Sequence, residues 1–523
     1  MRQGAHPIVA VAESHFRSLR PLGQTSLCSI AVVGPQGDSC SMSDDSTQIL
    51  KSDSGPQPVP VATSDTDHSV GRRLQANLIW AGAGRLLSVC FLFLIHAWLT
   101  HHLAKVDYGR FVLIESITLL LSILVLGGLP AVSLRMLRGY LVGGDVAGAS
   151  SVVRASLLIM AGTSVLAVVG LSAISYLGQD RILNGVLWQW FPWILAWATC
   201  SAFLRMVSEL ARGFEMLGFS YLVGGQSGGF GVNAFLLICM VVASFLSPLS
   251  LPMVFGLQIA VQLCCTIPAI IVLLKLTTHD QPAAYSGSMA LSLRRVIASS
   301  TPLLIQQIVA FGIPEVDTIL LGSFASTDET ALYGASKKLV FLAVVPLLLV
   351  NHAIQPFVAE LHAKRDFVRL TAIVRGTATI AALPGLVLVL TLILIPDTIL
   401  SLCFGPEYTA AAISTRILAA GSAAFLVTGS CGLVQTMTGH ERSAMWTSLI
   451  AGGLYLCAAP LLISKFGILG AAVGTTSLQF LTRFSSLFMV YYHEKIWTSM
   501  TVSGTVLSRC LSLLLAGRSR ANK

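Results

Sequence analysis

Charged side chains are scarce in this sequence. Asp, Glu, Lys and Arg make up 11% of the 523 residues, whereas a soluble globular chain carries roughly 25%. A chain with so few charges cannot coat a water-facing surface, which excludes a soluble enzyme, a charged disordered protein and a secreted disulfide scaffold. Because 54% of the residues are hydrophobic, the remaining class is a polytopic membrane protein.

Spacings typical of metal and redox sites are also lacking. The eleven cysteines include no CxxC pair, so neither a zinc site nor a redox motif is indicated. Most of the cysteines lie within apolar runs, where a free Cys behaves as a small buried hydrophobe. No cofactor and no metal are therefore expected. The net charge of +9 does not predict nucleic-acid binding, because the Lys and Arg residues of a membrane protein collect in its cytoplasmic loops.

Residues 1–70 differ in composition from the remainder of the chain. They are rich in Ser, Asp, Gly, Pro and Gln, as in 39–45 and 52–60, and such a stretch cannot bury enough apolar surface to offset its ordering entropy. We expect a disordered cytoplasmic extension. The block lacks the pattern of a signal peptide. Met42 is an alternative translation start to Met1, which N-terminal sequencing would decide.

Apolar runs of the length that spans a bilayer begin after this block. The runs are long and continuous, which favours helices over a barrel, and no loop is long enough for a soluble domain. The weak run 500–515 within the tail, 496–523, is interrupted by Arg509 and is expected to be interfacial or disordered. The twelve predicted spans are 76–98, 108–129, 152–177, 183–204, 220–246, 250–274, 297–323, 332–356, 372–395, 410–434, 444–463 and 468–491.

The distribution of Lys and Arg predicts the orientation. Lys and Arg are more frequent in the loops that lie on the same side of the membrane as the N-terminus than in those on the opposite side. Because such residues collect in cytoplasmic loops, both termini are expected in the cytoplasm. Arg205, Glu209 and Arg212 follow helical spacing and form a charged stripe on one face. We expect that stripe to belong to a helix lying on the inner leaflet.

The two halves of the chain share landmarks. Arg72-Arg73 and Arg294-Arg295 precede spans one and seven, and Tyr108-Gly109 and Tyr333-Gly334 open spans two and eight. Pro130 and Pro356 occupy matching places at nearly the same offset. The pattern predicts two six-helix lobes, 71–280 and 281–495, with the same topology. Two such lobes rocking about a central cavity would open it to alternate faces of the membrane.

Four segments in this order resemble a known family. They are Lys105-Val-Asp-Tyr-Gly-Arg-Phe111, Val316-Asp-Thr-Ile-Leu-Leu-Gly-Ser-Phe324, Ala331-Leu-Tyr-Gly-Ala-Ser-Lys-Lys-Leu339 and Cys403-Phe-Gly-Pro-Glu-Tyr-Thr-Ala-Ala-Ala412. Together they are similar to polysaccharide flippases of the multidrug/oligosaccharidyl-lipid/polysaccharide exporter superfamily, over about 72–493. The resemblance implies a bacterial inner-membrane protein that moves an undecaprenyl-pyrophosphate-linked oligosaccharide outward for O-antigen or other polysaccharide biosynthesis. Its implied partners are that lipid-linked oligosaccharide, membrane lipids and a polysaccharide polymerase complex.

Cations within the predicted spans are candidates for cargo binding, because ionisable groups are costly in a membrane. A central cavity would let them converge on a pyrophosphate or an acidic sugar. Alternatively, Lys337, Lys338 and Arg416 extend to the outer lipid headgroups, and Arg85 pairs with Glu115. The candidates are Arg85, Arg483, Lys337, Lys338 and Arg416.

Two further sets of polar residues lie within the spans. Glu115 of the second span, and Asp317 with Glu315 late in the seventh, are candidates for proton coupling. For Glu115 the alternative is pairing with a cation, and for Asp317 a structural hydrogen bond is an equal alternative. Amide side chains bind sugar hydroxyls, and they also join helices. The amide candidates for a polar lumen are Gln258, Gln262, Gln306, Gln307, Asn351 and Gln355.

Two other functions compete with a flippase. A multidrug or cation exporter of the same superfamily would prefer an acidic lumen, whereas the deep charges here lean basic. A membrane polysaccharide polymerase or ligase would carry a large outer loop with catalytic residues, and the sequence has no such loop. We therefore expect a transporter and not an enzyme.

Overall fold

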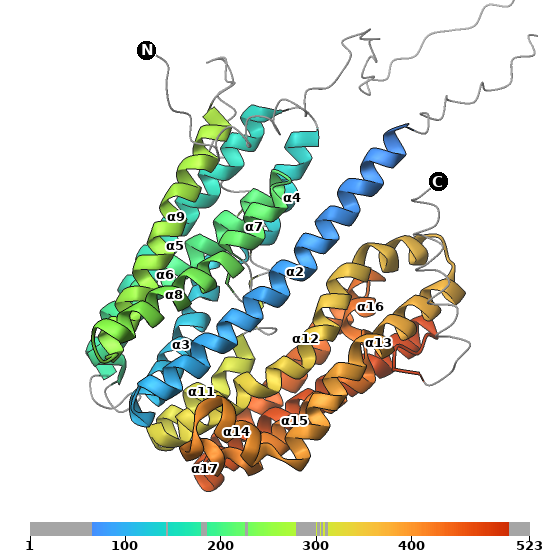
Figure 1. The fold of residues 1–523 in the computed structure, drawn as a ribbon. Coiled ribbons are helices and arrows are strands. Elements are labelled where there is room, and N and C mark those ends of the chain that lie inside the picture. The colour runs from blue at the N-terminus through green and yellow to red at the C-terminus, as the bar shows by residue number, and fades with distance from the viewer. Residues whose placement is uncertain are drawn as a thin grey trace, which may run out of the picture. The chain divides into compact units, whose positions relative to one another are not determined.

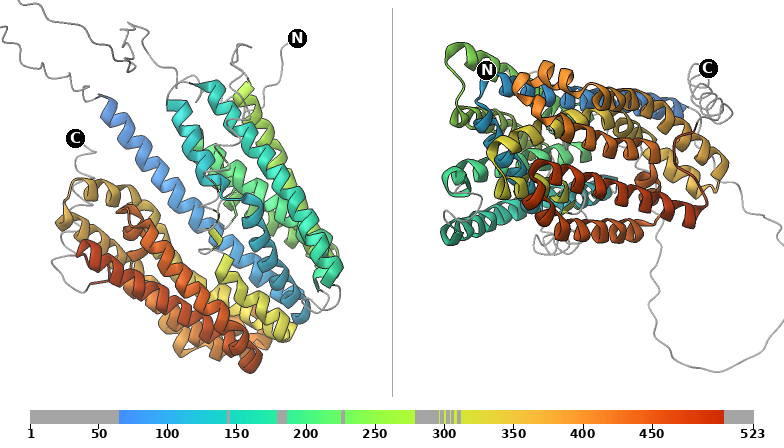
Figure 2. Two further views of the ribbon diagram at one scale, coloured as in Figure 1. Left: turned by 180° about the vertical axis from the view of Figure 1, so that it is seen from behind. Right: turned by 90° about the horizontal axis from the view of Figure 1, so that it is seen from below.

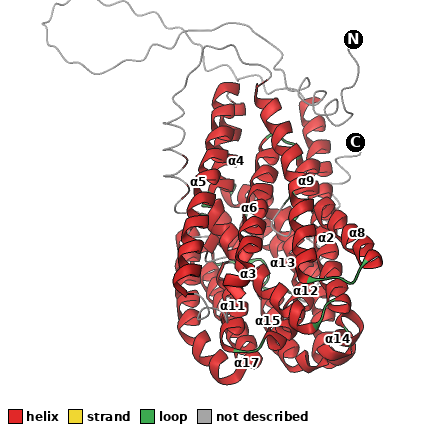
Figure 3. Cartoon of the chain, turned by 90° about the vertical axis from the view of Figure 1, so that its left-hand side faces the viewer, coloured by secondary structure: helices red, strands yellow, loops and turns green. Residues whose placement is uncertain are grey.

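The computed structural model describes residues 65–142, 145–178, 186–224, 228–278, 296, 300, 304, 307–308 and 312–501. The chain divides into two units, Met1–Ser69 and Val70–Lys523, and the helices discussed below belong to the second unit apart from the first residues of α2. Helices account for nearly all of these residues and no strand occurs among them, as Figure 3 shows. The expectation of an all-α polytopic membrane fold is confirmed.

The first group of helices corresponds to the predicted N-terminal lobe and is drawn in blue to green in Figure 1. It consists of α2 (Asp65–His102), α3 (Lys105–Leu126), α4 (Leu129–Val142), α5 (Val146–Gly178), α6 (Val186–Gly213), α7 (Leu217–Val223), α8 (Phe230–Leu246) and α9 (Leu251–Thr278).

The second group corresponds to the predicted C-terminal lobe and is drawn in yellow to red, as Figures 1 and 2 show. It consists of α11 (Ile313–Phe324), α12 (Thr327–Ala363), α13 (Phe367–Leu394), α14 (Pro396–Phe404), η4 (Pro406–Ala411), α15 (Ala412–Thr428), α16 (Cys431–Met437) and α17 (Glu441–Glu494).

Nine helical segments among the described residues are long and apolar enough to cross a membrane. The segment Arg442–Glu494 contains two of the predicted spans, because α17 is kinked at Gly467, whose φ is 52°. The Glu329 carboxylate accepts a hydrogen bond from the Ile468 backbone N–H beyond the kink, at 3.0 Å. The short helices α8 and α11 lie within the two remaining predicted spans. The chain is thus a multi-pass membrane protein.

Three segments differ from the sequence expectation. The second span ends at Leu126, because Gly127 and Gly128 both have positive φ, and the chain then resumes as α4. The fifth span is broken between α7 and α8, where a Cβ on Gly229 would lie 2.3 Å from the Leu222 carbonyl oxygen. The third difference is that α6 is one helix to Gly213, so Arg205 does not lie on a separate helix at the inner leaflet.

The two lobes meet where α3 packs against α11 and α12. Glycines permit this close approach: a Cβ on Gly109 would lie 2.0 Å from the Thr327 carbonyl oxygen, and one on Gly334 would lie 2.6 Å from Val112. The Tyr-Gly landmarks repeated in the sequence therefore face each other across the lobes. We call this region, where α3 and α12 begin, the junction end.

Aromatic rings add to the junction end. The ring of Tyr108 stacks edge-on against Tyr408 at 5.9 Å, and Phe93 stacks edge-on against Phe404 at 5.7 Å. Each pair joins a helix of the first lobe to a segment of the second. Edge-to-face aromatic pairs contribute about 0.5–1.5 kcal/mol beyond their buried area, so these contacts stabilise the closed arrangement of this end.

The described part of the tail folds back onto the second lobe. The Thr501 backbone N–H donates to the Thr379 hydroxyl at 2.9 Å, and Arg375 donates to the Ser499 carbonyl oxygen at 3.1 Å. Residues 502–523, which include most of the predicted 500–515 run, lie outside the described residues, as does the predicted N-terminal extension up to residue 64.

Candidate functional site

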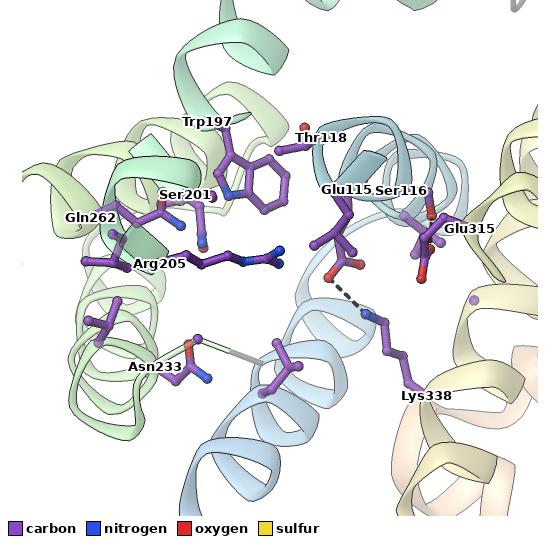
Figure 4. A pocket seen from close by; sticks show the side chains of 18 of the residues that line it. Glu115, Ser116, Thr118, Trp197, Ser201, Arg205, Asn233, Gln262, Glu315 and Lys338 are labelled. Carbon is purple, nitrogen blue, oxygen red and sulfur yellow. Dashed lines mark hydrogen bonds and ion pairs between the residues drawn. The ribbon is translucent and has the colours of Figure 1, made fainter. Parts of the chain in front are cut away.

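A cavity with a volume of about 250 Å³ lies at the lobe junction. Its wall comes from both lobes: α2, α3, α6, α8 and α9 on one side, and α11 and α12 on the other. Figure 4 shows the side chains that line it, with Arg205 pointing from α6 across the cavity toward Glu115. Polar and charged side chains are therefore gathered inside a span region that is otherwise apolar.

One face of α6 supplies an aromatic ring, a hydroxyl and a cation. Trp197, Ser201 and Arg205 are spaced at i, i+4 and i+8 and all line the cavity, because residues four apart lie on one face of a helix. The Trp197 ring stacks on Phe111 at 5.7 Å and contacts Phe255 at 5.8 Å. These neighbours fix the orientation of the indole toward the cavity.

Amide side chains from α8 and α9 line the same side. The Ser201 hydroxyl donates to the side-chain amide oxygen (Oε1) of Gln262 at 3.2 Å, and Gln258 lies one turn before Gln262 on α9. Asn233 donates to the Ser88 carbonyl oxygen at 3.1 Å, which joins α8 to α2. Both roles expected for the amides from the sequence are therefore compatible with their positions, since they line the cavity, where cargo would bind, and also link helices.

The second lobe contributes a lysine held by two acids. The Lys337 ammonium lies 3.0 Å from the Asp317 carboxylate and 3.3 Å from the Glu315 carboxylate, and it donates to the Pro314 carbonyl oxygen. Asp317 is buried and also accepts hydrogen bonds from the hydroxyls of Tyr333 and Thr475, at 2.6 and 2.9 Å. Lys337 therefore lines the cavity as part of a fixed polar centre, whose buried acid, Asp317, lies behind the wall.

Two polar contacts cross between the lobes inside the cavity. The Lys338 ammonium lies 2.9 Å from the Glu115 carboxylate, and the Ser116 hydroxyl donates to the Glu315 carboxylate at 2.9 Å. The paired residues come from α3 on one side and from α12 or α11 on the other. Any motion that separates the lobes here must break both contacts.

Six of the candidate residues from the sequence line this cavity. They are Lys337, Lys338, Glu115, Glu315, Gln258 and Gln262. Each of the two lysines is accompanied by carboxylates, so the cavity is not uniformly basic. The alternative considered for Arg85, a pair with Glu115, is not formed, because Glu115 contacts Lys338 and His96 instead.

The other three predicted cations lie away from this cavity. Arg85 lies on α2 near Tyr221 of the same lobe. The Arg416 guanidinium is 3.4 Å from Asp397, at an exposed place consistent with the alternative interpretation made for it. The Arg483 guanidinium lies 3.8 Å above the Phe425 ring. The structure therefore does not bring five cations together, because these three do not line the cavity that Lys337 and Lys338 line.

The remaining amides are dispersed. The Ser430 hydroxyl donates to the side-chain amide oxygen (Oδ1) of Asn351 at 2.5 Å, and neither Asn351 nor Gln355 lines the cavity. Gln307 is half-buried, and Gln306 lies outside the described residues. Among the residues that the structure describes, no group of His, Cys, Asp and Glu side chains is arranged to hold a metal ion.

Sequence reasoning missed three residues of this region. His96 is buried against Glu115, Trp197 forms part of the wall, and Arg205 was assigned to a membrane surface. The spacing of Trp197, Ser201 and Arg205 was a usable signal, since one helical face carrying all three predicts a polar lining. His96 gave no such signal, because its partner lies on a different helix.

Replacing Asp317 with alanine should destabilise the second lobe by about 3 kcal/mol. The change removes the buried carboxylate that pairs with Lys337, and both Lys337 and Tyr333 lose a hydrogen-bond acceptor. The measurement is the midpoint of thermal unfolding in detergent. The control is Asp397→Ala, since Asp397 is exposed and pairs with Arg416 at the surface, where a loss below about 1 kcal/mol is expected. Equal midpoints for the two variants would contradict this account of Asp317.

Comparisons with known proteins fit this architecture. Residues 302–461 match the MatE family model, which is a family of transporters. No curated protein sequence matches the chain. The agreement with a transporter family bears out the expectation of a transporter and not an enzyme.

Several solved structures share the fold. An inward-facing multidrug resistance MATE transporter of the MOP superfamily superimposes with a TM-score of 0.60 at 13% identity, covering 86% of this chain and 98% of that chain. The lipid II flippase MurJ, in an inward closed conformation, gives 0.52 at 12% identity, covering 87% and 92%. The Vibrio cholerae MATE transporter VcmN in its bent form gives 0.51 at 16% identity, covering 82% and 98%. At these identities the likeness concerns the fold, which in MATE transporters has twelve helices in two lobes.

Proposed function

We propose that this chain is a transporter that carries an amphipathic cargo across the membrane by alternating access through the cavity at the lobe junction. One observation carries the proposal: the cavity wall is shared between the lobes, and the contacts Glu115–Lys338 and Ser116–Glu315 join them across it. Lobes that rock apart break these contacts and open the cavity on the side of the junction end.

The comparisons favour a multidrug exporter, whose cargo would be an aromatic cation. The MatE match and two of the structures with the same fold concern MATE transporters, one of them a multidrug resistance transporter. The cavity also suits an aromatic cation, because the Trp197 ring attracts positive charge and the Glu115 and Glu315 carboxylates line the cavity. Such a cargo would compete with Lys338 and Lys337 for these carboxylates.

A lipid-linked oligosaccharide is the second cargo class. The sequence motifs resemble those of polysaccharide flippases, and a lipid II flippase shares the fold. Arg205 and the two lysines would bind the pyrophosphate, with bidentate contacts from the guanidinium, while Gln258 and Gln262 would bind sugar hydroxyls. Under this proposal the protein serves polysaccharide or O-antigen biosynthesis and works beside a polysaccharide polymerase complex.

One experiment separates the two classes. The full chain is reconstituted in liposomes and offered, in separate arms, a fluorescent aromatic cation and a fluorescent undecaprenyl-pyrophosphate oligosaccharide. Transport of the cation alone supports the exporter, and movement of the lipid-linked sugar alone supports the flippase. Movement of neither, with protein shown to be folded and inserted, would overturn the proposed function.

Replacing Trp197 with alanine is expected to slow transport of the accepted cargo by about five- to thirtyfold, because a loss of about 1–2 kcal/mol in ring contacts corresponds to that range. Trp188→Ala provides the matched control. Trp188 lies on the same helix but is 52% exposed and does not line the cavity. Equal initial rates of transport for the two variants would show that the indole does not contact the cargo.

The orientation remains the one that the sequence predicts. We propose a bacterial inner-membrane location with both termini in the cytoplasm, which places the junction end toward the outside. An impermeant thiol reagent added to intact cells should label Val106→Cys, at the exposed start of α3, in a background without other cysteines. Labelling only after the cells are broken would reverse the proposed orientation.

A further inference from the structure

His96 extends the contact between the lobes into a buried chain of polar groups. Its Nε2 lies 3.4 Å from the Glu115 Oε1 atom, and its Nδ1 lies 3.2 Å from the Tyr108 hydroxyl. The Lys338 ammonium lies 2.9 Å from the same Oε1 atom. His96 and Tyr108 are 1% and 0% exposed. An imidazole and an ammonium therefore share one carboxylate oxygen in a region from which water is largely excluded.

The four residues are divided unequally between the lobes. His96, Tyr108 and Glu115 belong to α2 and α3, whereas Lys338 belongs to α12. A motion that parts the lobes removes Lys338 from Glu115 and leaves His96 in place. A carboxylate left without a cation in such surroundings costs several kcal/mol, so another positive charge must replace the lysine.

We propose that His96 and Glu115 together form the proton-binding site of the transport cycle, which takes up one proton when Lys338 withdraws and releases it when Lys338 returns. This inference rests on the proposed alternating access. The lysine keeps its own proton throughout, and the incoming proton is shared between imidazole and carboxylate. Histidine suits this role because its charge changes near physiological pH.

The sequence of events gives exchange of protons for cargo. With the junction end facing outward, the proton enters from outside when this end opens and cargo leaves. Closure brings Lys338 back to Glu115, and the proton is released toward the cytoplasmic side. One cation always accompanies Glu115, so neither open nor closed lobes leave its charge uncompensated.

Other titratable groups face this site from the surrounding elements. Tyr108 contacts His96 directly, and the Tyr408 ring of η4 packs against Tyr108. Arg205 points toward Glu115 from α6, as Figure 4 shows. Glu315 of α11 lies next to it through Ser116. Glu315 and Tyr408 belong to the second lobe and move with Lys338. His96 and Lys338 both contact the Glu115 Oε1 atom, so the exchange takes place between these two groups.

The test measures opening of the junction end and requires no cargo. Spin labels are attached at Val106→Cys and Phe324→Cys, exposed positions on α3 and α11, in an otherwise cysteine-free full chain in lipid nanodiscs. Their distance is recorded between pH 4 and pH 9. We expect the wild-type background to open as the pH falls, because the proton displaces Lys338 from Glu115.

The variants give distinct outcomes. His96→Gln should shift the opening transition toward acid by about 1–2 pH units, since a carboxylate alone then takes the proton. Glu115→Gln should open at every pH, because the carboxylate that holds Lys338 is gone. The matched control is His102→Gln, since His102 lies on the same helix, is exposed and bonds only to its own helix; its curve should follow the background.

Two results would overturn the inference. One is a His96→Gln curve that coincides with the background, and the other is a Glu115→Gln variant that retains the background transition. If His96→Gln does not elute as a single folded species, Lys338→Gln decides the question from the other side, because it should remove the pH dependence. Failure of the transport assay alone would concern the proposed cargo and would leave this measurement unaffected.

Discussion

Alanine in place of Lys338 is expected to abolish transport and to lower the stability of the closed lobes by about 3 kcal/mol. The side chains of Lys338 and Glu115 are 21% and 11% exposed and lie 2.9 Å apart. Removing one partner of a largely buried ion pair leaves the other charge uncompensated, which costs several kcal/mol. The measurements are the transport rate in liposomes and the midpoint of thermal unfolding.

A double variant separates the charge from the contact. Glu115→Gln combined with Lys338→Gln removes both charges, so it should recover most of the stability that Lys338→Ala loses. Any transport by this double variant should not depend on pH. Lys364→Ala is the matched control, because the Lys364 side chain is 65% exposed and pairs with Glu360 on the surface, where ion pairs contribute little. Normal transport by Lys338→Ala would show that this ion pair does not join the lobes during the cycle.

Alanine in place of Gly109 is expected to hold the junction end open and to reduce transport at least tenfold. The added Cβ would lie 2.0 Å from the Thr327 carbonyl oxygen and 2.9 Å from its carbonyl carbon. Both are backbone atoms at the start of α12, so no side-chain rotation relieves the clash. The start of α12 must move away from α3, which disrupts closure of the lobes at this end.

The distance between labels at Val106→Cys and Phe324→Cys measures this displacement directly. Gly162→Ala is the control, because a Cβ at that helical position meets nothing within 4 Å. Alanine there should leave the distance and the transport rate unchanged, and it adds up to about 1 kcal/mol of helix stability. A Gly109→Ala variant with the background distance at neutral pH would show that the close approach of the helices is not needed for closure.

The pairing of charges could not be predicted from the sequence. Glu115 and Lys338 are 223 positions apart, and helical spacing relates only residues within one helix. The same limit explains Arg85 and Arg483, which lie deep in predicted spans yet do not line the cavity. Depth in a span indicates that a charge needs a partner, but it does not indicate which helix provides that partner.

The Tyr-Gly repeat in the sequence marked the region where the two lobes pack against each other. Tyr108 and Tyr333 are both fully buried, and the glycines beside them lie where α3 and α12 approach most closely. Repetition in the sequence marked equivalent positions in the two lobes. That each glycine packs against the helix that carries the other follows from the packing of the lobes, since Gly109 lies against Thr327 and Gly334 lies against Val112.

The sequence by itself determined that this protein is a helical membrane protein and where its spans lie, because a bilayer requires long apolar runs whose backbone groups bond within each helix. Tertiary structure alone decided which ionisable side chains meet. Those contacts join helices far apart along the chain, and the rotation of each helix against its neighbours is set by packing at residues such as Gly109 and Gly334, and not by hydropathy.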